Sequence, residues 1–194
     1  MAFDSFLKLD GIKGESADAK HKGEIDILAF RFGAAQTGTH GSGGGGGAGK
    51  VQIRDIQFKK KVDSSSPLLF LNCASGAHIK EANFVVRKAG GTQLEFLKIK
   101  LTDVLISSVS PHGHGEQNEE LTSIPDSWTN ATSGAGLAAL PAGAVKSWGD
   151  EVPFEDLSLN FARIDYQYQP QGADGKAQGG PIIAGWDVKG NQKI

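Results

Sequence analysis

The feature that most constrains the fold is a set of four long segments in which apolar and polar residues alternate and then change phase. In one of them, Leu97, Ile99 and Leu101 share one parity. Val104 and Ile106, further along the same segment, share the other. Alternation indicates a half-buried strand, and a phase change within a strand is typical of a β-bulge or a barrel bend. The other three segments are residues 24–36, 51–58 and 157–168. Four such strands predict a strongly coiled sheet or a small closed barrel rather than a flat open sheet.

The composition favours one domain built from strands and loops. The chain has 194 residues, of which 27 are glycine, so it can bury a core and does not have the character of a helical bundle. Its net charge of −2 gives no indication of nucleic-acid or membrane binding. Cys73 is the only cysteine, so no intramolecular disulfide can form. The first residues have no basic region followed by a long apolar run, so we expect neither a signal peptide nor membrane insertion.

Local patterns predict several further strands. Residues 3–9 form a first strand that ends at the turn pair Asp10-Gly11. Residues 85–88 and 94–109 flank a glycine-containing turn, and residues 182–188 form the last strand.

One short helix is predicted after the three serines 64–66, which offer N-caps. Pro67 suits the first helical position, and Gly76 suits the position just after the last turn. A helix of two to three turns must pack an apolar face on the sheet to persist. We interpret Cys73, which lies on it, as a small buried apolar side chain.

Residues 41–50 form a glycine run, GSGGGGGAGK, that ends like a phosphate-binding loop. The pattern G-x-x-x-x-G-K-[ST] fits from Gly44 to Lys50, but Val51 replaces the hydroxyl that must ligate Mg²⁺. Residues 51–54 then alternate as a strand, whereas a phosphate loop should open a helix. We interpret the run as a flexible loop between two strands. A hydrolase or NTPase that uses Lys50 is the alternative, which a phosphate-release assay on Lys50→Ala would test.

Residues 111–151 differ from the rest of the chain in composition and in hydrophobic pattern, and they are predicted to be a mostly irregular insertion within the domain 1–194. His112 and His114 could bind a metal, with Glu116 and Glu119 as candidates by proximity. No further ligand has a telling spacing, so an exposed polar loop is the default interpretation. The sequence contains no G-x-S-x-G, H-E-x-x-H or CxxC motif, and we predict no catalytic residue, metal site or cofactor.

Two charged features of the strands are candidates for contacts. Lys59-Lys60-Lys61 is interpreted as a solvated charge run at a strand end, with an interface patch as the alternative. Arg31 lies between Phe30 and Phe32 and should face away from the core.

An ordered set of short stretches resembles Hcp, the tube protein of bacterial type VI secretion systems. The stretches cover most of the chain and are Phe6-Leu7-Lys8, Gly14-Glu15-Ser16, His21, Glu24-Ile25-Asp26, Phe30-Arg31-Phe32-Gly33, Gly46-Gly47-Ala48-Gly49-Lys50, Ser66-Pro67-Leu68, Cys73-Ala74-Ser75-Gly76, His78, Arg87-Lys88-Ala89-Gly90-Gly91, Glu95-Phe96, residues 104–109, Leu159-Asn160-Phe161-Ala162 and Gly185-Trp186.

The resemblance implies a mainly β fold, a small β-barrel of two antiparallel sheets with one short flanking α-helix. It further implies a homo-hexameric ring that stacks into a tube inside a contractile sheath, behind a spike protein. Sheath contraction exports the tube, and effector proteins travel in its lumen. The expansion at residues 111–151 departs from the family, whose members have a short turn there; we expect it to modify stacking, sheath contact or cargo.

The resemblance places the glycine loop at contacts between subunits or rings, and we add the lysine run to that expectation. The candidate contact residues are Gly41, Gly43, Gly44, Gly45, Gly46, Gly47, Lys50, Lys59, Lys60 and Lys61, and Arg31 is the candidate for the lumen. The alternative function is a monomeric β-sandwich module that binds carbohydrate, with Trp128 and Trp148 available to stack on a ligand.

Overall fold

The structure is a computed structural model that describes residues 3–36, 51–88, 93–113, 152–172 and 175–194. The elements in these residues are β1 (Phe3–Leu9), β2 (Ile25–Asp26), β3 (Ala29–Arg31), β4 (Ala34–Ala35), β5 (Gln52–Ile53), β6 (Ile56–Lys61), α1 (Ser66–Ser75), β7 (His78–Lys88), β8 (Glu95–His112), β9 (Phe154–Tyr168), β10 (Ile182–Asp187) and β11 (Gln192–Lys193). The predicted mainly β fold with antiparallel sheets and one helix is therefore confirmed. Its two sheets are unequal, because nine strands form one sheet and β4 and β5 form the other.

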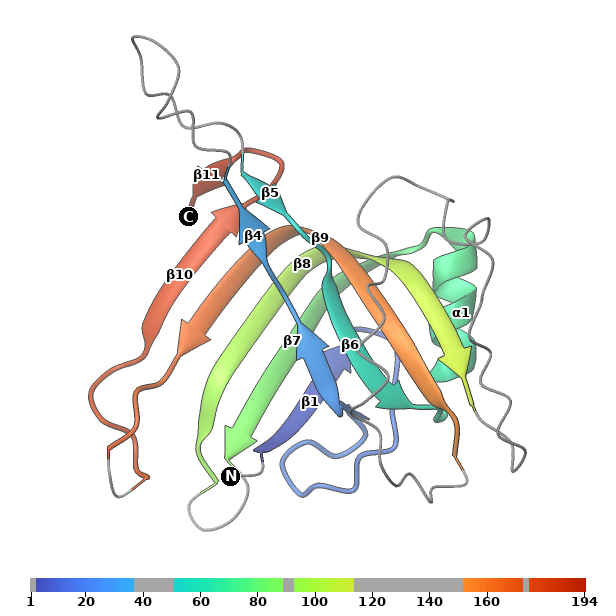
Figure 1. Ribbon diagram of the computed structural model, residues 1–194, viewed down its shortest axis with the longest axis horizontal. Helices are drawn as coiled ribbons and strands as arrows, with labels where there is room; N and C mark the ends of the chain where they lie inside the picture. The colour runs from blue at the N-terminus through green and yellow to red at the C-terminus, as the bar shows by residue number, and fades with distance from the viewer. Residues whose placement is uncertain (1–2, 37–50, 89–92, 114–151, 173–174) are drawn as a thin grey trace, which may run out of the picture.

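The large sheet curves around one core (Figure 1). Its strand order is β11-β10-β9-β8-β7-β1-β2, while β6 pairs with β9 and β3 pairs with β6. The first part of β9 therefore lies between β8 and β6, and its last part lies between β8 and β10. β9 is the strand at which the sheet divides.

The predicted continuous strand over residues 24–36 is wrong, because the chain turns a corner there and forms three short strands. β2 pairs with β1, β3 pairs with β6 and β4 pairs with β5. The corner lies between Ile27, which is buried, and Leu28, which is exposed. The phase change in this segment thus marks the point where the chain crosses from one edge of the curved sheet to the other. In the described residues the two edges are joined by this stretch of chain, and no ladder links β2 to β3.

The phase changes in β8 and β9 lie opposite each other. Leu101 pairs with Ile164, and Val104 pairs with Phe161; all four side chains are buried. Asp103, between the two β8 residues, has a left-handed φ of 54°, which Asp tolerates better than most residues. This local distortion lets both flanking side chains face the core. A register shift between Ile106 and Ser108 adds a bulge further along the same ladder.

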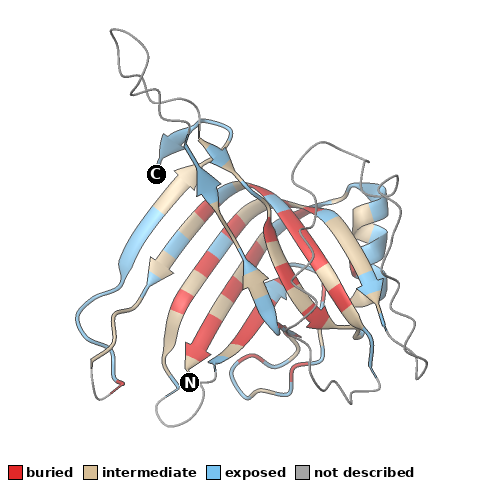
Figure 2. Cartoon of the chain, in the orientation of Figure 1, coloured by how far each residue is buried: buried red, intermediate tan, exposed pale blue. Residues whose placement is uncertain are grey.

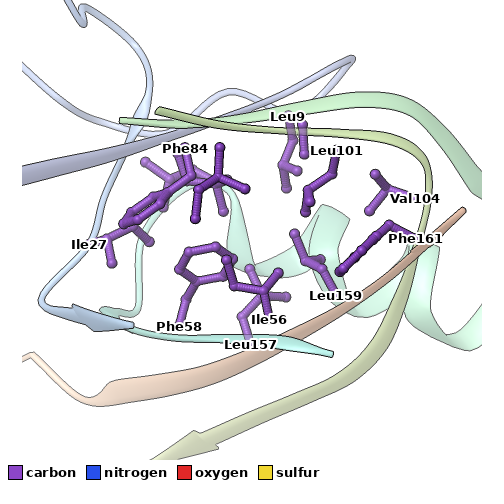
Figure 3. Packing of buried hydrophobic residues seen from close by; sticks show 14 of the residues in the cluster. Leu9, Ile27, Ile56, Phe58, Phe84, Leu101, Val104, Leu157, Leu159 and Phe161 are labelled. Atoms are coloured by element: carbon purple, nitrogen blue, oxygen red, sulfur yellow. The ribbon is translucent and has the colours of Figure 1, made fainter. Parts of the chain in front are cut away.

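Buried side chains are concentrated in β1 and β6–β9, while the first half of β10 and the outer side of α1 are exposed (Figure 2). At the centre of the core, the rings of Phe58 and Phe84 lie 5.0 Å apart and tilted by 57° (Figure 3). The other large apolar residues that are fully enclosed are Leu7, Ile25, Ile56, Leu69, Ile99, Leu101, Ile106, Leu157 and Leu159.

The helix α1 forms where the sequence predicts it. Its N-cap is Ser65, a proline follows in the first turn, and Gly76 ends it with a left-handed φ of 64°. The only fully buried residue of the helix is Leu69, and Cys73 is partly buried against the core. Within the described parts of the chain, no helix is long and apolar enough to cross a membrane.

Candidate assembly surfaces

The outer side of α1 carries three large apolar side chains that the described residues do not cover. Leu68, Phe70 and Leu71 are all exposed, and the Phe70 side chain is 65% exposed. Successive residues of a helix point about 100° apart, so the burial of Leu69 turns these three outward. We call Leu68, Phe70 and Leu71 the helix patch. Contiguous exposed apolar surface of this kind marks an interaction site in a folded protein.

A second apolar surface lies where β9 and β10 leave the core. Tyr168 pairs with Ile182 on one side and with buried Leu97 on the other, so all three share one face of the sheet. The face of the sheet that packs on the core at Leu97 thus continues to Tyr168 and Ile182, where the core no longer covers it. Ile183, on the opposite face, is also exposed, as is Tyr166. We call Tyr166, Tyr168, Ile182 and Ile183 the edge patch.

The backbone beside the edge patch is also available. β11 pairs with β10 only at Trp186 and Asp187, so among the described strands the stretch Ile182–Ala184 has a neighbour on one side alone. Edge strands with apolar side chains are templates for pairing with another chain unless something protects them. Figure 1 shows β10 and α1 on opposite flanks of the molecule, so the two patches lie far apart on one chain.

The structure corrects the interpretation of the lysine run. Lys60 is fully buried and forms an ion pair with Glu155, with 2.9 Å between Nζ and Oε2. The solvated charge run is therefore wrong for Lys60, which is also unavailable for contacts with another copy. Lys59 and Lys61 are partly exposed, and the Lys59 ammonium lies 5.4 Å from the ring centroid of Phe154. A contact role for these two lysines stays a prediction.

The remaining sequence candidates are not brought together. Arg31 is exposed on β3, and its place in a lumen stays a prediction. The glycine loop with Lys50, the residues His114, Glu116 and Glu119, and most of the expected insertion lie outside the described residues. β8 extends through Pro111 and His112, so these two belong to the strand rather than to the insertion. The Nδ1 of His112 lies 3.6 Å from Asp156 Oδ2, and the described residues contain no cluster of three metal-binding side chains.

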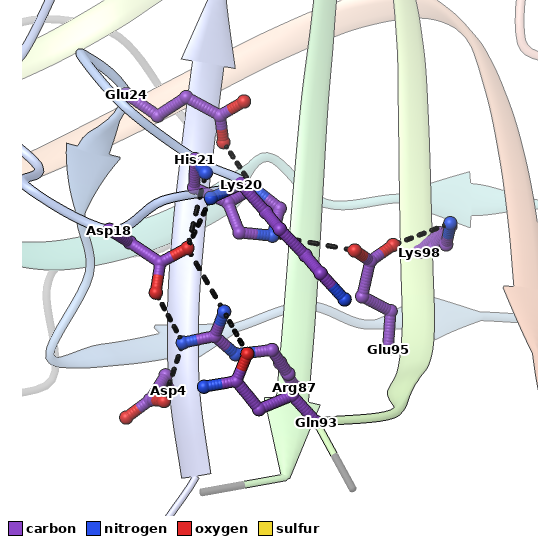
Figure 4. A network of polar contacts seen from close by, with 9 residues as sticks. All are labelled: Asp4, Asp18, Lys20, His21, Glu24, Arg87, Gln93, Glu95 and Lys98. Carbon is purple, nitrogen blue, oxygen red and sulfur yellow. Dashed lines mark hydrogen bonds and ion pairs between the residues drawn. The ribbon is translucent and has the colours of Figure 1, made fainter.

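A polar network that the sequence did not predict fixes residues 13–24 on the outside of β1 and β7 (Figure 4). The buried Arg87 donates to Asp18 at 2.7 and 3.0 Å and to Asp4 at 2.9 Å. The hydrogen bond from Arg87 is the main reason that the pKa of Asp18 lies well below its usual range. The pKa of Arg87 is raised in return, chiefly by Asp18.

The imidazole of His21 extends this network toward β8. It stacks on Phe6 with 4.2 Å between ring centroids, and its Nδ1 lies 2.9 Å from Glu24 Oε2. Its Nε2 lies 3.5 Å from Glu95 Oε1. An open pocket of about 500 Å³ lies beside the network, but two of its carboxylates are already engaged by Arg87. We therefore assign the network a structural role.

The sequence contained a signal for both patches. Ile182 and Ile183 are adjacent apolar residues, which strict alternation does not explain, and residues 68–71 are all apolar, which one helix face cannot bury. The lysine pattern also held a signal, because Lys60 shares the parity of Ile56 and Phe58 and therefore points inward.

Comparison with known proteins identifies the family. The chain matches the family model described as Type VI secretion system effector, Hcp, over residues 6–168. It is 40% identical to Protein hcp1 of Pseudomonas aeruginosa over 192 residues, 98% of each chain. Among solved structures it is similar to a type six secretion system protein (TM-score 0.77, 28% identity) and to Hcp1 from Salmonella typhimurium (TM-score 0.66, 34% identity), each over 100% of both chains.

Hcp proteins are secreted structural components of the type VI secretion system and not enzymes, so the predicted absence of an enzymatic function is confirmed. The matches extend over the core strands, the helix α1 and the strand β9 that carries part of the edge patch. The chain therefore belongs to the Hcp family of type VI secretion system proteins.

Proposed function

We propose that this protein is a ring-forming tube component of its secretion system. Six copies join side by side, and the rings stack into a tube that a contractile sheath expels behind a spike protein. Effector proteins travel in the lumen, and export needs no cleaved signal. Membership of the Hcp family supports this role. The observation that carries the assembly is the pair of uncovered apolar patches on opposite flanks of one chain.

Two different patches on opposite flanks of one chain favour a head-to-tail contact. The helix patch of one copy meets the edge patch of the next, and each copy keeps one free patch for a further neighbour. Head-to-tail contacts generate a ring when the rotation between copies closes. Both patches are rich in Phe, Tyr, Leu and Ile, and the buried centre of a stable interface is apolar and enriched in aromatic residues.

The test uses one variant for each patch. Phe70→Ser with Leu71→Ser removes the helix patch, and Ile182→Ser with Ile183→Ser removes the edge patch. Native mass spectrometry should find rings for the unmodified chain and monomers for each double variant alone. Leu28→Ser, an exposed apolar residue outside both patches, is the matched control and should leave rings intact.

Mixing the two double variants tests the head-to-tail geometry itself. One variant keeps a working edge patch and the other keeps a working helix patch, so together they can form one contact and no more. We expect a one-to-one heterodimer and no larger species. If either variant formed dimers alone, the contact would join like patches. An unmodified chain that stays monomeric at every concentration would refute ring formation and favour the single-copy binding module.

A further inference from the structure

Lys60 and Glu155 form a buried ion pair on the side of the β6–β9 ladder that faces the core. Lys60 continues the inward row of β6 after Ile56 and Phe58, and Glu155 precedes Leu157 in the corresponding row of β9. The two residues face each other directly in the β6–β9 ladder. The Lys60 side chain has no exposed surface, and the Glu155 side chain is 2% exposed. A lysine thus occupies a position where the pattern of the strand calls for an apolar residue.

Each donor of the buried ammonium has an acceptor, and two of the three acceptors lie in the first turn of α1 or in the turn just before it. Lys60 Nζ lies 2.9 Å from Glu155 Oε2, 2.9 Å from Asp63 Oδ1 and 3.1 Å from Ser66 Oγ. The Ser66 hydroxyl donates to Glu155 Oε2 at 2.9 Å and accepts from the Asp63 amide at 3.1 Å. Asp63 Oδ1 also accepts from the amide of Ser65, the N-cap residue, at 2.9 Å. The pair therefore fixes the turn that leads into the helix.

A buried ion pair is a costly way to fill a core position. Desolvation opposes the attraction between the charges, and apolar residues of similar volume often stabilise a fold as well or better. Unlike an apolar contact, the ion pair with its hydrogen bonds fixes the relative orientation of the groups that it joins, because hydrogen bonds constrain angle as well as distance. The other contacts of α1 with the core come from the buried Leu69 and the partly buried Cys73, and such apolar contacts do not fix the angle of the helix as hydrogen bonds do.

We propose that Lys60 and Glu155 are positioning residues that set the orientation of α1 on the sheet and so present the helix patch to the next copy. The first half of this statement concerns one chain; the second half depends on the proposed ring. The pair acts through Ser66 and Asp63 and touches no neighbouring copy. This role predicts different effects on stability and on assembly. Removing both charges should leave the fold intact but disturb the orientation of α1.

The test replaces both charges with apolar side chains of similar length, Lys60→Met with Glu155→Met. Cys73 reports on the helix because it is the chain's only cysteine, lies on α1 and is partly buried against the core. Labelling by a thiol reagent is measured in the Ile182→Ser, Ile183→Ser background, so that no neighbouring copy covers the thiol. We expect the melting temperature to be unchanged or higher and the labelling rate to rise about tenfold or more, since Cys73 reacts when α1 opens locally. In the otherwise unmodified chain, ring formation should require about tenfold more protein.

A milder variant keeps the proposal testable if the double variant does not fold. Ser66→Ala leaves the ion pair and the N-cap residue in place and removes only the hydroxyl that connects Glu155 to the helix. It should also accelerate Cys73 labelling, by a smaller factor. Ser75→Ala, at the other end of α1, removes a hydroxyl that bonds only within the helix and should change nothing.

The outcomes separate this inference from the proposed function. Unchanged Cys73 labelling in both Ser66→Ala and the double methionine variant would overturn the positioning role. Faster labelling with unaltered ring formation would overturn its link to assembly. If the unmodified chain formed no ring, the proposed function would fail, while the labelling rates would still decide whether the pair orients α1.

Discussion

The backbone amides of Ile27 and Leu28 donate to different strands although the residues are neighbours. Ile27 donates to the Ser5 carbonyl in β1 at 2.9 Å, and Leu28 donates to the Lys59 carbonyl in β6 at 2.8 Å. Two consecutive peptide units thus connect the two edges of the curved sheet. These two hydrogen bonds link the edges at a point where the described strands β2 and β3 do not pair with each other.

Leu28→Pro should weaken this corner because proline has no amide hydrogen to donate. The Lys59 carbonyl would lose its partner, and the free energy of unfolding should fall by about 1–3 kcal/mol. Leu28→Ala keeps the amide and trims a largely exposed side chain, so it should cost less than about 1 kcal/mol. Urea denaturation of both variants measures the difference. Equal losses would show that the side chain, and not the amide, holds the corner.

The corner also shows what alternation can and cannot predict. Ile25 and Ile27 share one parity and Leu28 and Phe30 the other, so the phase change at the corner is visible in the sequence. The first strand and the helix were predicted with nearly the observed bounds. Alternation is a local property, so it could not distinguish a bulge from a crossing between strands. That distinction depends on β1 and β6, which are distant in sequence from this segment.

The assembly surfaces could be predicted only in part, for a related reason. Lys60 looked solvated because three lysines in a row suggest a charged surface, whereas its partner Glu155 lies 95 positions away in the chain. Ile182 was correctly placed on a strand, but its exposure follows from β9 leaving the core, which only the three-dimensional arrangement shows. The family resemblance was visible because it depends on the order of short motifs and not on such contacts.

Substitutions at two phenylalanines should separate folding from assembly. Phe84 is buried between Phe58 and Phe30, with ring centroids 5.0 and 4.7 Å away, so Phe84→Ala should cost about 3–5 kcal/mol of unfolding free energy. Phe70→Ala removes an exposed ring and should change that free energy by less than about 0.5 kcal/mol. Only Phe70→Ala should therefore yield a stable chain with impaired ring formation. Calorimetry combined with native mass spectrometry tests both halves of this expectation.

Gly14 should tolerate no side chain, because the backbone of the opposing segment lies too close. A Cβ at this position would come within 2.5 Å of the Glu24 carbonyl oxygen and 2.7 Å of the Ile25 Cα. Backbone atoms cannot move aside as a flexible side chain can, so we expect Gly14→Ala to cost about 1–3 kcal/mol. Gly33→Ala is the control, since a Cβ there meets no atom within 4 Å. Similar denaturation midpoints for the two variants would contradict this account.

The Asp18–Arg87 contact should make the fold sensitive to acid. Arg87 lowers the pKa of Asp18 below its ordinary value of 3.8, so the folded state favours the ionised carboxylate more than the unfolded chain does. A lowered pKa contributes stability that is fully present above about pH 5 and is lost as the pH falls toward the folded-state pKa. Asp18→Asn should therefore lower stability at neutral pH and flatten its decline below about pH 5.

The matched control for acid sensitivity is Asp10→Asn, in the turn that directly follows β1, where the residue is exposed. Denaturation midpoints measured from neutral to acidic pH should follow the unmodified chain for Asp10→Asn and diverge from it for Asp18→Asn. The difference between the Asp18→Asn variant and the unmodified chain should be greatest at neutral pH. It should shrink on acidification, because protonation of Asp18 in the unmodified chain removes the charge that the asparagine variant already lacks. A constant difference across the whole range would show that Asp18 acts through shape and not through its charge.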